Sequence, residues 1–332
     1  MSSSATTAQG APGAPSAPTS PATGRTPRSA RSAGTSPTGA RHDRARNLLI
    51  ALFLLPTMLG LIVFTFLPIV ASFVLAFFSW DIITAPEFVG LANFADIATD
   101  RTIRVAFGNT LLFVLVAVVL QLSVALGLAV LVQTKMPARL RGFFRSVLFF
   151  PLVLSAASVS IIMSYLFNEN FGLVNDLLGR IGIPAVPWLT SPTGAVIMVV
   201  LVYVWQNFGF SFLLFLGGLS SIPREVYEAA SVDGATGWRQ FWTITFPLVS
   251  PTTLVASVMA IIAALQIFDQ PYVLTRGGPG DSTRTAVMVI YESAFKQLEF
   301  GRASAIGIVL TIIIMLVTAL QFRLSRRFVF YG

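Results

Sequence analysis

Few side chains in this sequence could perform covalent or metal chemistry. The 332 residues include no Cys and a single His, His42, which excludes disulfides, thiolate zinc sites and Cys nucleophiles and removes most catalysis that depends on His. The only Lys residues are Lys135 and Lys296, and the chain has no G-x-x-x-x-G-K-[ST], H-E-x-x-H or G-x-S-x-G motif. We therefore expect no catalytic residue, no metal site and no cofactor bound by this chain.

Residues 220–247 form the most informative polar segment. Pro223 suits the first position of a helix, Glu225 suits its first turn, where the helix dipole favours an anion, and Gly234 permits a sharp turn with positive φ. Aromatic residues spaced three and four apart then form one face of a second amphipathic stretch: Trp238, Phe241 and Trp242. The segment is predicted to be a surface helix–turn–helix, either an interfacial connector or a docking element for a soluble partner.

A second group of polar residues lies in or beside the apolar runs of the C-terminal half: Gln206, Asn207, Ser211, Gln266, Asp269 and Tyr272. Amides and aromatic rings suit the hydroxyl groups and ring faces of sugars. The alternative is that these side chains join helices by hydrogen bonds, each worth about 1 kcal/mol or less. Ion-coupled carriers usually place ionisable groups near the bilayer midplane. Acidic residues are almost absent from the interiors of the apolar runs, and Asp269, at the end of a run, is the one borderline case. This near absence counts against an ion-coupled carrier.

The elements that must position these residues are membrane-spanning helices. Hydrophobic residues make up 55% of the chain and charged residues only 11%, which leaves too little polar surface for a soluble fold. Six long uncharged runs lack the alternation of a transmembrane barrel, and a spanning helix needs about 20 residues. We predict spans near residues 50–76, 106–133, 146–167, 193–219, 249–269 and 304–322, with Pro56 and Pro68 kinking the first span.

The distribution of charge predicts the orientation and the domains. Of the 22 Lys and Arg residues, 15 fall in the N-terminal tail, in alternate connecting segments and at the C-terminus, so the positive-inside rule places both termini in the cytoplasm. Residues 1–46 are predicted to be a disordered tail, because Ala, Ser, Thr, Gly and Pro fill 36 of the 46 positions. Residues 47–332 would form the six-helix transmembrane domain. The net charge of +8 lies on a very apolar background, so nucleic-acid binding is not expected.

Within residues 220–247, Glu228-Ala229-Ala230 and Asp233-Gly234-Ala235 are followed by Phe241, Ile244 and Pro247. This order resembles the EAA loop of permease subunits in bacterial ATP-binding-cassette importers, in the sugar and glycerol-phosphate family typified by the maltose transporter. Three further segments resemble motifs of the same family in the same order: residues 86–94, 268–280 and 300–305. The resemblance covers roughly residues 47–330, and the N-terminal tail has no counterpart in it.

The resemblance implies an all-α permease of the type I importer class, multi-pass in the bacterial cytoplasmic membrane. Such a chain is not an enzyme. It pairs with a second permease subunit, an external solute-binding protein and two ATPase subunits, which bind the ATP and Mg²⁺. Glu228 would pair with a basic group of the ATPase, and Gly234 would form the turn. The residues assigned to this coupling are Tyr227, Glu228, Ala229, Ala230, Asp233 and Gly234.

The resemblance also implies that the transported solute is of carbohydrate type, namely a sugar, an oligosaccharide, a polyol or glycerol-3-phosphate. The interiors of the predicted spans hold no basic group, which favours a neutral sugar. Two alternatives differ in class. One is a secondary carrier or channel that needs no ATPase, and the other is a membrane scaffold or receptor that transports nothing. Loss of transport on deletion of the ATPase separates the importer from the carrier, and an uptake assay in liposomes separates both from the scaffold.

Overall fold

The computed structural model describes residues 38–328, which belong to two compact units with a boundary after Gly60. The first unit contains most of helix α1 (Thr38–Leu61). Most of the predicted disordered tail, residues 1–46, lies outside the described residues. The helix begins before the predicted end of that tail, in a stretch where Ala45 and Arg46 are good helix formers.

The second unit begins at Leu61 and starts with an irregular helical turn. The π-helical segment η1 (Ile62–Phe66) leads into α2 (Leu67–Leu75). Pro68 has no N–H to donate to the carbonyl of Phe64, so the hydrogen-bond register changes at this point. Pro56, by contrast, lies inside α1 without interrupting it. Of the two prolines expected to kink the first span, only Pro68 therefore coincides with an irregularity.

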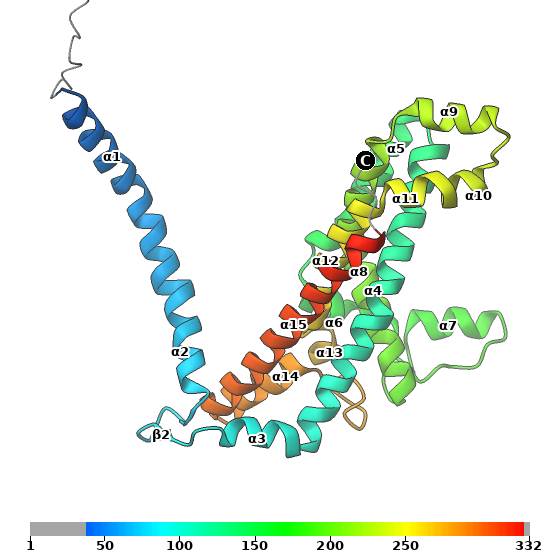
Figure 1. Cartoon of the computed structure of the whole chain (residues 1–332). Helices are drawn as coiled ribbons and strands as arrows, with labels where there is room; N and C mark the ends of the chain where they lie inside the picture. The colour runs from blue at the N-terminus through cyan, green and yellow to red at the C-terminus, as the bar shows by residue number, and fades with distance from the viewer. Residues whose placement is uncertain (1–37, 329–332) are drawn as a thin grey trace, which may run out of the picture. The chain divides into compact units, whose positions relative to one another are not determined.

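Helices α4 (Arg101–Lys135) and α8 (Pro192–Ser220) form the centre of this unit and pack on each other more extensively than any other pair. Helix α5 (Ala138–Val153) packs on α8, α12 (Ser250–Leu265) packs on α4, and α15 (Phe300–Phe328) packs on α12 (Figure 1). The core consists of apolar side chains from these helices, and its largest fully buried members include Phe113, Met198, Phe212, Phe215 and Leu265.

Five helical segments of the described chain are long and apolar enough to cross a membrane. They are Arg46–Leu75, Arg101–Gln133, Pro192–Ser220, Ser250–Leu274 and Phe300–Arg326. Each coincides with a predicted span, with ends that differ by a few residues. Long apolar runs without charges are therefore sufficient to locate these five helices in the sequence.

The third predicted span, near residues 146–167, is not one continuous helix, so the prediction of a single unbroken helix there was wrong. Helix α5 ends at Val153, α6 (Ala156–Leu166) begins after Ser155, and the two are bent by 98°. Pro151 lacks a backbone donor in the last turn of α5, and Leu154 and Ser155 have extended conformations. Only if the bent pair is taken as one span does the described chain contain six.

Short elements lie at the two ends of α4 and α8 (Figure 1). At the end that we call the α3 end, the strands β1 (Phe78–Ser79) and β2 (Glu87–Phe88) form an antiparallel hairpin that precedes α3 (Ala92–Thr99). Phe78 lies opposite Phe88, and Ser79 opposite Glu87. The opposite end, which we call the α9 end, contains α9 (Arg224–Val232), α10 (Gly237–Gln240), the π turn η2 (Phe241–Thr245) and α11 (Phe246–Leu248). The remaining short helices are α7 (Leu173–Arg180), α13 (Asp269–Leu274), α14 (Ala286–Tyr291) and η3 (Glu292–Lys296).

Two of the motif segments, residues 86–94 and 300–305, meet at the α3 end. The Asn93 side chain donates hydrogen bonds to the carbonyl oxygens of Ala76 and Phe78, at 2.9 and 3.0 Å. Gly301 lies against the same Phe78 carbonyl, and a Cβ atom on Gly301 would be 1.8 Å from that oxygen. These contacts dock the start of α15 on the hairpin, and they require a residue without a side chain at position 301.

A network of charges reinforces the α3 end. Asp100 caps α4 by accepting hydrogen bonds from the backbone N–H groups of Thr102 and Ile103, at 2.6 and 3.3 Å, and it pairs with Arg302. Burial raises the pKa of Asp100, but the two N–H groups and the Arg302 guanidinium outweigh it, so the net pKa lies below its ordinary value. The pair joins α4 to α15, two helices that are distant in sequence.

Candidate functional site

The described chain contains the helix–turn–helix predicted from residues 220–247. In the turn after α9, Gly234 has a φ of +75°, and the N–H of Ala235 donates to the carbonyl of Ala230 at 2.9 Å. Helix α10 begins directly after Thr236. Pro223 caps α9 instead of occupying its first position, so the predicted start differs by one residue. The positive φ is the reason that glycine suits this turn.

Side-chain hydrogen bonds join the two arms of this element. The hydroxyl of Tyr227 lies 3.1 Å from Oγ1 of Thr245 in η2. Nε2 of Gln240 donates to Oγ of Ser231 and to the carbonyl oxygen of Ala235, at 2.9 and 3.1 Å. Because η2 runs through α11 into the spanning helix α12, these bonds connect α9 mechanically to a span.

The surface of α9 carries acidic side chains that the described part of the chain does not pair with a basic one. Glu228, Ala229 and Asp233 are exposed. Within the described residues, the carboxylates of α9 and its turn form no ion pair with Lys or Arg. Val232 beside them is 88% exposed. A rigid helix that presents unpaired carboxylates and an exposed apolar side chain is suited to contact with a basic surface of another protein.

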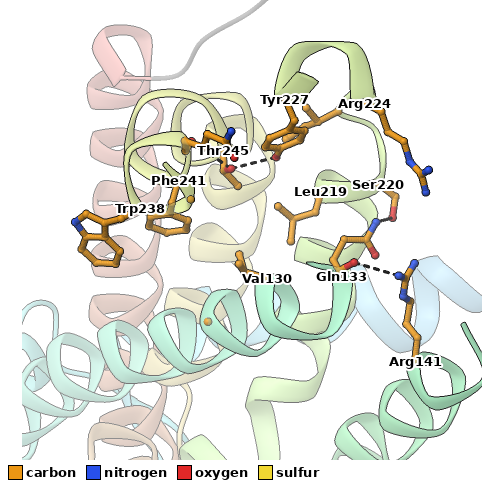
Figure 2. Close-up of a pocket in the computed structure, with 14 residues that line it drawn as sticks. Val130, Gln133, Arg141, Leu219, Ser220, Arg224, Tyr227, Trp238, Phe241 and Thr245 are labelled. Atoms are coloured by element: carbon orange, nitrogen blue, oxygen red, sulfur yellow. Dashed lines mark hydrogen bonds between the residues drawn. The ribbon is translucent and has the colours of Figure 1, made fainter. Parts of the chain in front are cut away.

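A cavity of about 990 Å³ lies beneath this element, against the ends of α4 and α8. Its walls combine apolar and basic side chains. Val130 and Leu219 line one part of it, and Arg141 and Arg224 also line it, on the same side in the view of Figure 2. This cavity was not predicted from the sequence, because its lining comes from helices that are far apart in the chain.

A smaller polar cavity, of about 280 Å³, lies at the break between α5 and α6. Leu154 contributes to its lining from the break itself, and four predicted path residues join it there: Gln206, Asn207, Gln266 and Asp269. The side chains of Gln266 and Asp269 are exposed and form no hydrogen bond with other described residues. Their polar atoms are therefore available to a ligand in the cavity. Asn207 is half-buried and donates to the carbonyl of Tyr203 at 2.9 Å, which leaves its side-chain oxygen as an acceptor.

Gln206 has a different place in this cavity. The side chain is buried, its Nε2 donates to the carbonyl of Leu154 at 3.0 Å, and its Oε1 accepts from Nε2 of Gln270 at 2.9 Å. The break between α5 and α6 deprives the Leu154 carbonyl of a helical partner, and Gln206 supplies one. Neither Gln270 nor this carbonyl was identified from the sequence, because the break itself was not predicted.

The last two predicted path residues, Ser211 and Tyr272, do not line the polar cavity. Ser211 is buried and accepts a hydrogen bond from Nε2 of Gln121 at 3.0 Å, which joins α8 to α4. Tyr272 stacks on Phe268 with 4.9 Å between ring centroids, and Phe268 itself lines the cavity. Ser211 therefore forms a hydrogen bond between helices, which was the alternative to a role in the solute path. Tyr272 packs on the ring of Phe268 that lines the cavity.

Tyr291 and Lys296, which were not predicted, extend the aromatic group of Phe268 and Tyr272 beside the cavity. Tyr291 packs against Phe268 and Tyr272, with ring centroids 5.2 and 5.3 Å apart, and Nζ of Lys296 lies 5.4 Å from the centre of the Tyr272 ring. Lys296 also pairs with Glu292 at 3.4 Å. Among the residues with described positions, no group of three or more His, Cys, Asp and Glu side chains could hold a metal ion.

Comparison with known proteins identifies the relatives of this chain. Residues 124–330 match the family described as the binding-protein-dependent transport system inner membrane component. The chain is 35% identical over 286 residues to the sulfoquinovosyl glycerol transport system permease protein SmoG of Agrobacterium fabrum, covering 86% of this chain and 92% of that protein. It is 36% identical to the multiple sugar-binding transport system permease protein MsmF of Streptococcus mutans, covering 83% and 94%.

Two further comparisons agree. The sn-glycerol-3-phosphate transport system permease protein UgpA of Agrobacterium fabrum is 35% identical over 74% of this chain and 83% of its own length. A crystal structure of a bacterial ABC transporter that imports the acidic polysaccharide alginate contains a chain with the same fold. The TM-score is 0.76 at 23% identity, with 87% of this chain and 99% of that chain covered. The present chain therefore belongs to the family of binding-protein-dependent transport system inner membrane components.

Proposed function

We propose that this chain forms part of the translocation path of an ATP-driven importer. Members of its family are inner-membrane transport subunits and not enzymes. The solute class is carbohydrate: a sugar, an oligosaccharide, a polyol or glycerol-3-phosphate. The names of three relatives, which refer to sulfoquinovosyl glycerol, multiple sugars and sn-glycerol-3-phosphate, support this class.

The observation that carries the proposal is the polar cavity at the break in the third predicted span. Irregular backbone inside a membrane is tolerated where it lines a cavity, and transporters build solute sites at such interrupted helices. Here the interruption coincides with amide and carboxylate side chains from α8 and the α12–α13 junction: Asn207, Gln266 and Asp269. Together with the ring of Phe268, they offer hydrogen-bond partners for hydroxyl groups and a flat apolar surface for a sugar ring.

The helix–turn–helix at the α9 end is proposed as the element that receives the force of ATP binding. Glu228 would pair with a basic group of the ATPase subunit, and Asp233 would add a second negative charge. Ala229 and Ala230 would allow close approach, and Gly234 would form the turn. The support for this role is that the carboxylates are unpaired within the described residues while Tyr227 fastens α9 to η2.

The proposed assembly contains a second permease subunit, two ATPase subunits that bind ATP and Mg²⁺, and an external solute-binding protein. In this arrangement both termini and the α9 end face the cytoplasm, and the α3 end faces outward. The bent pair α5–α6 then counts as the third of six spans. The predominance of Lys and Arg in the tail and alternate segments supports this orientation.

Uptake by the reconstituted transporter tests the proposal. Proteoliposomes should contain this chain with its partner permease and ATPase subunits, and uptake of labelled sugars should be measured with and without ATP. We expect uptake to require ATP and the ATPase subunits. Gln266→Ala and Asn207→Ala should raise the KM for the solute, whereas Gln297→Ala, which removes an exposed amide outside the cavity, should not. Uptake without the ATPase subunits, or an unchanged KM and rate in both cavity variants, would contradict the proposal.

A further inference from the structure

The large cavity at the α9 end has the composition of a binding site for an anionic amphiphile. Its volume of about 990 Å³ is at the upper end of the range for small-molecule sites. Among the residues that the structure describes, the lining includes Arg141 and Arg224 but no Asp or Glu. Apolar side chains, among them Val130, Leu219 and Phe241, form one part of the wall, and uncharged polar residues such as Gln133 and Gln240 form another. The cavity thus combines an uncompensated positive charge with a surface suited to a hydrocarbon chain.

The two arginines differ in how firmly they are held. Nη2 of Arg141 donates to the carbonyls of Gln133 and Met136, at 3.1 and 3.2 Å, at the end of α4. Its buried Nε has no partner within the described structure. Arg224 is exposed and makes no ion pair or hydrogen bond through its side chain with any described residue. Both residues line the cavity, on the same side in the view of Figure 2. Arg141 is therefore a fixed donor with unused capacity, and Arg224 is an exposed cation whose donors bind no other described residue.

We propose that this cavity binds one anionic phospholipid of the cytoplasmic leaflet. Its phosphate would lie between Arg141 and Arg224, and an acyl chain would follow the apolar wall. Basic pockets between spanning helices on the cytoplasmic side suit anionic headgroups. The ring of Trp238, on α10 and 73% exposed, also lines this cavity, and indole rings are enriched at the level of the headgroups. The apolar wall favours a lipid over free phosphate.

A lipid in this cavity would support the helix–turn–helix from below. Tyr227 and Phe241, which belong to the two arms of the helix–turn–helix, both line the cavity. A bound lipid would fill the space beneath these arms and resist their collapse toward α4 and α8. The inference rests on the cavity and its charges, not on the docking of the ATPase.

Native mass spectrometry of the detergent-solubilised transporter complex tests the proposal, with phosphatidylglycerol as the probe and phosphatidylcholine as the zwitterionic comparison. Wild-type complex should retain phosphatidylglycerol in preference to phosphatidylcholine. Arg224→Gln should reduce that retention by about tenfold, the size expected when a charge-assisted hydrogen bond is lost. The matched control is Arg239→Gln, which removes a positive charge from α10 outside the cavity lining and should leave retention unchanged. Because the Arg224 side chain binds no other described residue, the variant should fold normally, which its melting temperature would verify.

Three results would overturn the proposal. The first is equal retention of the two lipids by the wild-type complex. The second is retention of phosphatidylglycerol that does not differ between Arg224→Gln and Arg239→Gln. The third is complete displacement of the lipid by inorganic phosphate, which would make phosphate alone the ligand. None of these measurements requires ATP or a solute, so their failure is distinct from a failure of the import proposal.

Discussion

The two ends of the α4–α8 pair use charge in opposite ways. At the α3 end, acidic and basic side chains of the same chain bind each other, as in the pairs Asp100–Arg302, Glu299–Arg302 and Glu292–Arg284. At the α9 end, the described acidic and basic side chains of the helix–turn–helix have no such partners: Arg224, Glu225, Glu228, Asp233 and Arg239. Charge at the first end stabilises the fold, whereas charge at the second end remains available to other molecules.

The largest expected effect on stability is at Gly301. A Cβ atom there would meet the Phe78 carbonyl at 1.8 Å, whereas a Cβ on Gly307 of the same helix would meet nothing within 4 Å. Gly301→Val should therefore abolish accumulation of folded chain in the membrane, and Gly307→Val should not. Quantitative immunoblotting of the membrane fraction measures both. Equal accumulation of the two variants would contradict the conclusion that close packing of Gly301 on the hairpin stabilises the α3 end.

A smaller loss of stability is expected at Asp100. Asp100→Ala removes both the cap of α4 and the pair with Arg302, and loss of a helix cap alone costs about 1 kcal/mol. Asp233→Ala at the α9 end removes a carboxylate that has no described ion-pair partner and should leave the melting temperature unchanged. Thermal unfolding of the two purified variants measures how much each carboxylate contributes to stability. A larger destabilisation by Asp233→Ala would reverse the expected order.

The stabilisation that the Asp100 carboxylate provides should depend on pH. The folded-state pKa of Asp100 is lowered, so its contribution is fully present above the unfolded pKa of about 3.9. It is lost as the pH falls through the lower folded-state value. The difference in melting temperature between wild type and Asp100→Ala should therefore be constant near neutral pH and shrink below about pH 4. A difference that grew on acidification would contradict the assignment.

The smallest expected effect is at Tyr227. Tyr227→Phe removes the hydroxyl that lies 3.1 Å from Thr245, a hydrogen bond worth about 1 kcal/mol. We expect normal accumulation in the membrane and less solute transported per ATP hydrolysed, because α9 would be held less firmly to η2. Tyr165→Phe, whose hydroxyl makes no described hydrogen bond and which is 64% exposed, is the control. Unchanged coupling in Tyr227→Phe would show that this bond does not transmit force.

Most of the spans could be predicted from the sequence, because an uncharged apolar run is sufficient to identify a helix that crosses a membrane. The break at Leu154 could not be predicted in the same way. The run around it is uncharged on both sides of Pro151, and a proline alone does not show whether a span bends or breaks, as Pro56 inside the uninterrupted α1 illustrates. Gln206 provides the partner for the Leu154 carbonyl, and it comes from a helix that begins well after the break in the sequence.

Local signals also located the turn at Gly234, because the constraint of positive φ acts within one residue. The roles of the polar residues in the later spans depend on partners that are distant in sequence. Ser211 and Gln206 are both polar residues of α8, yet Ser211 binds Gln121 of α4 and Gln206 lines the polar cavity. Residue type and spacing could nominate these side chains but could not assign them to a helix contact or to a cavity.

The most direct test of the difference between the two ends is the recovery of the ATPase subunit with the Glu228→Lys variant. The full chain should be purified from membranes, and the co-purified ATPase should be quantified against the wild-type chain and against Glu225→Lys on the same helix. We expect Glu228→Lys to reach the membrane at the wild-type level, to lose most of the ATPase and to abolish uptake, and Glu225→Lys to retain more of both. Wild-type recovery of the ATPase together with normal uptake in Glu228→Lys would contradict the proposal that the exposed charge of α9 docks the ATPase.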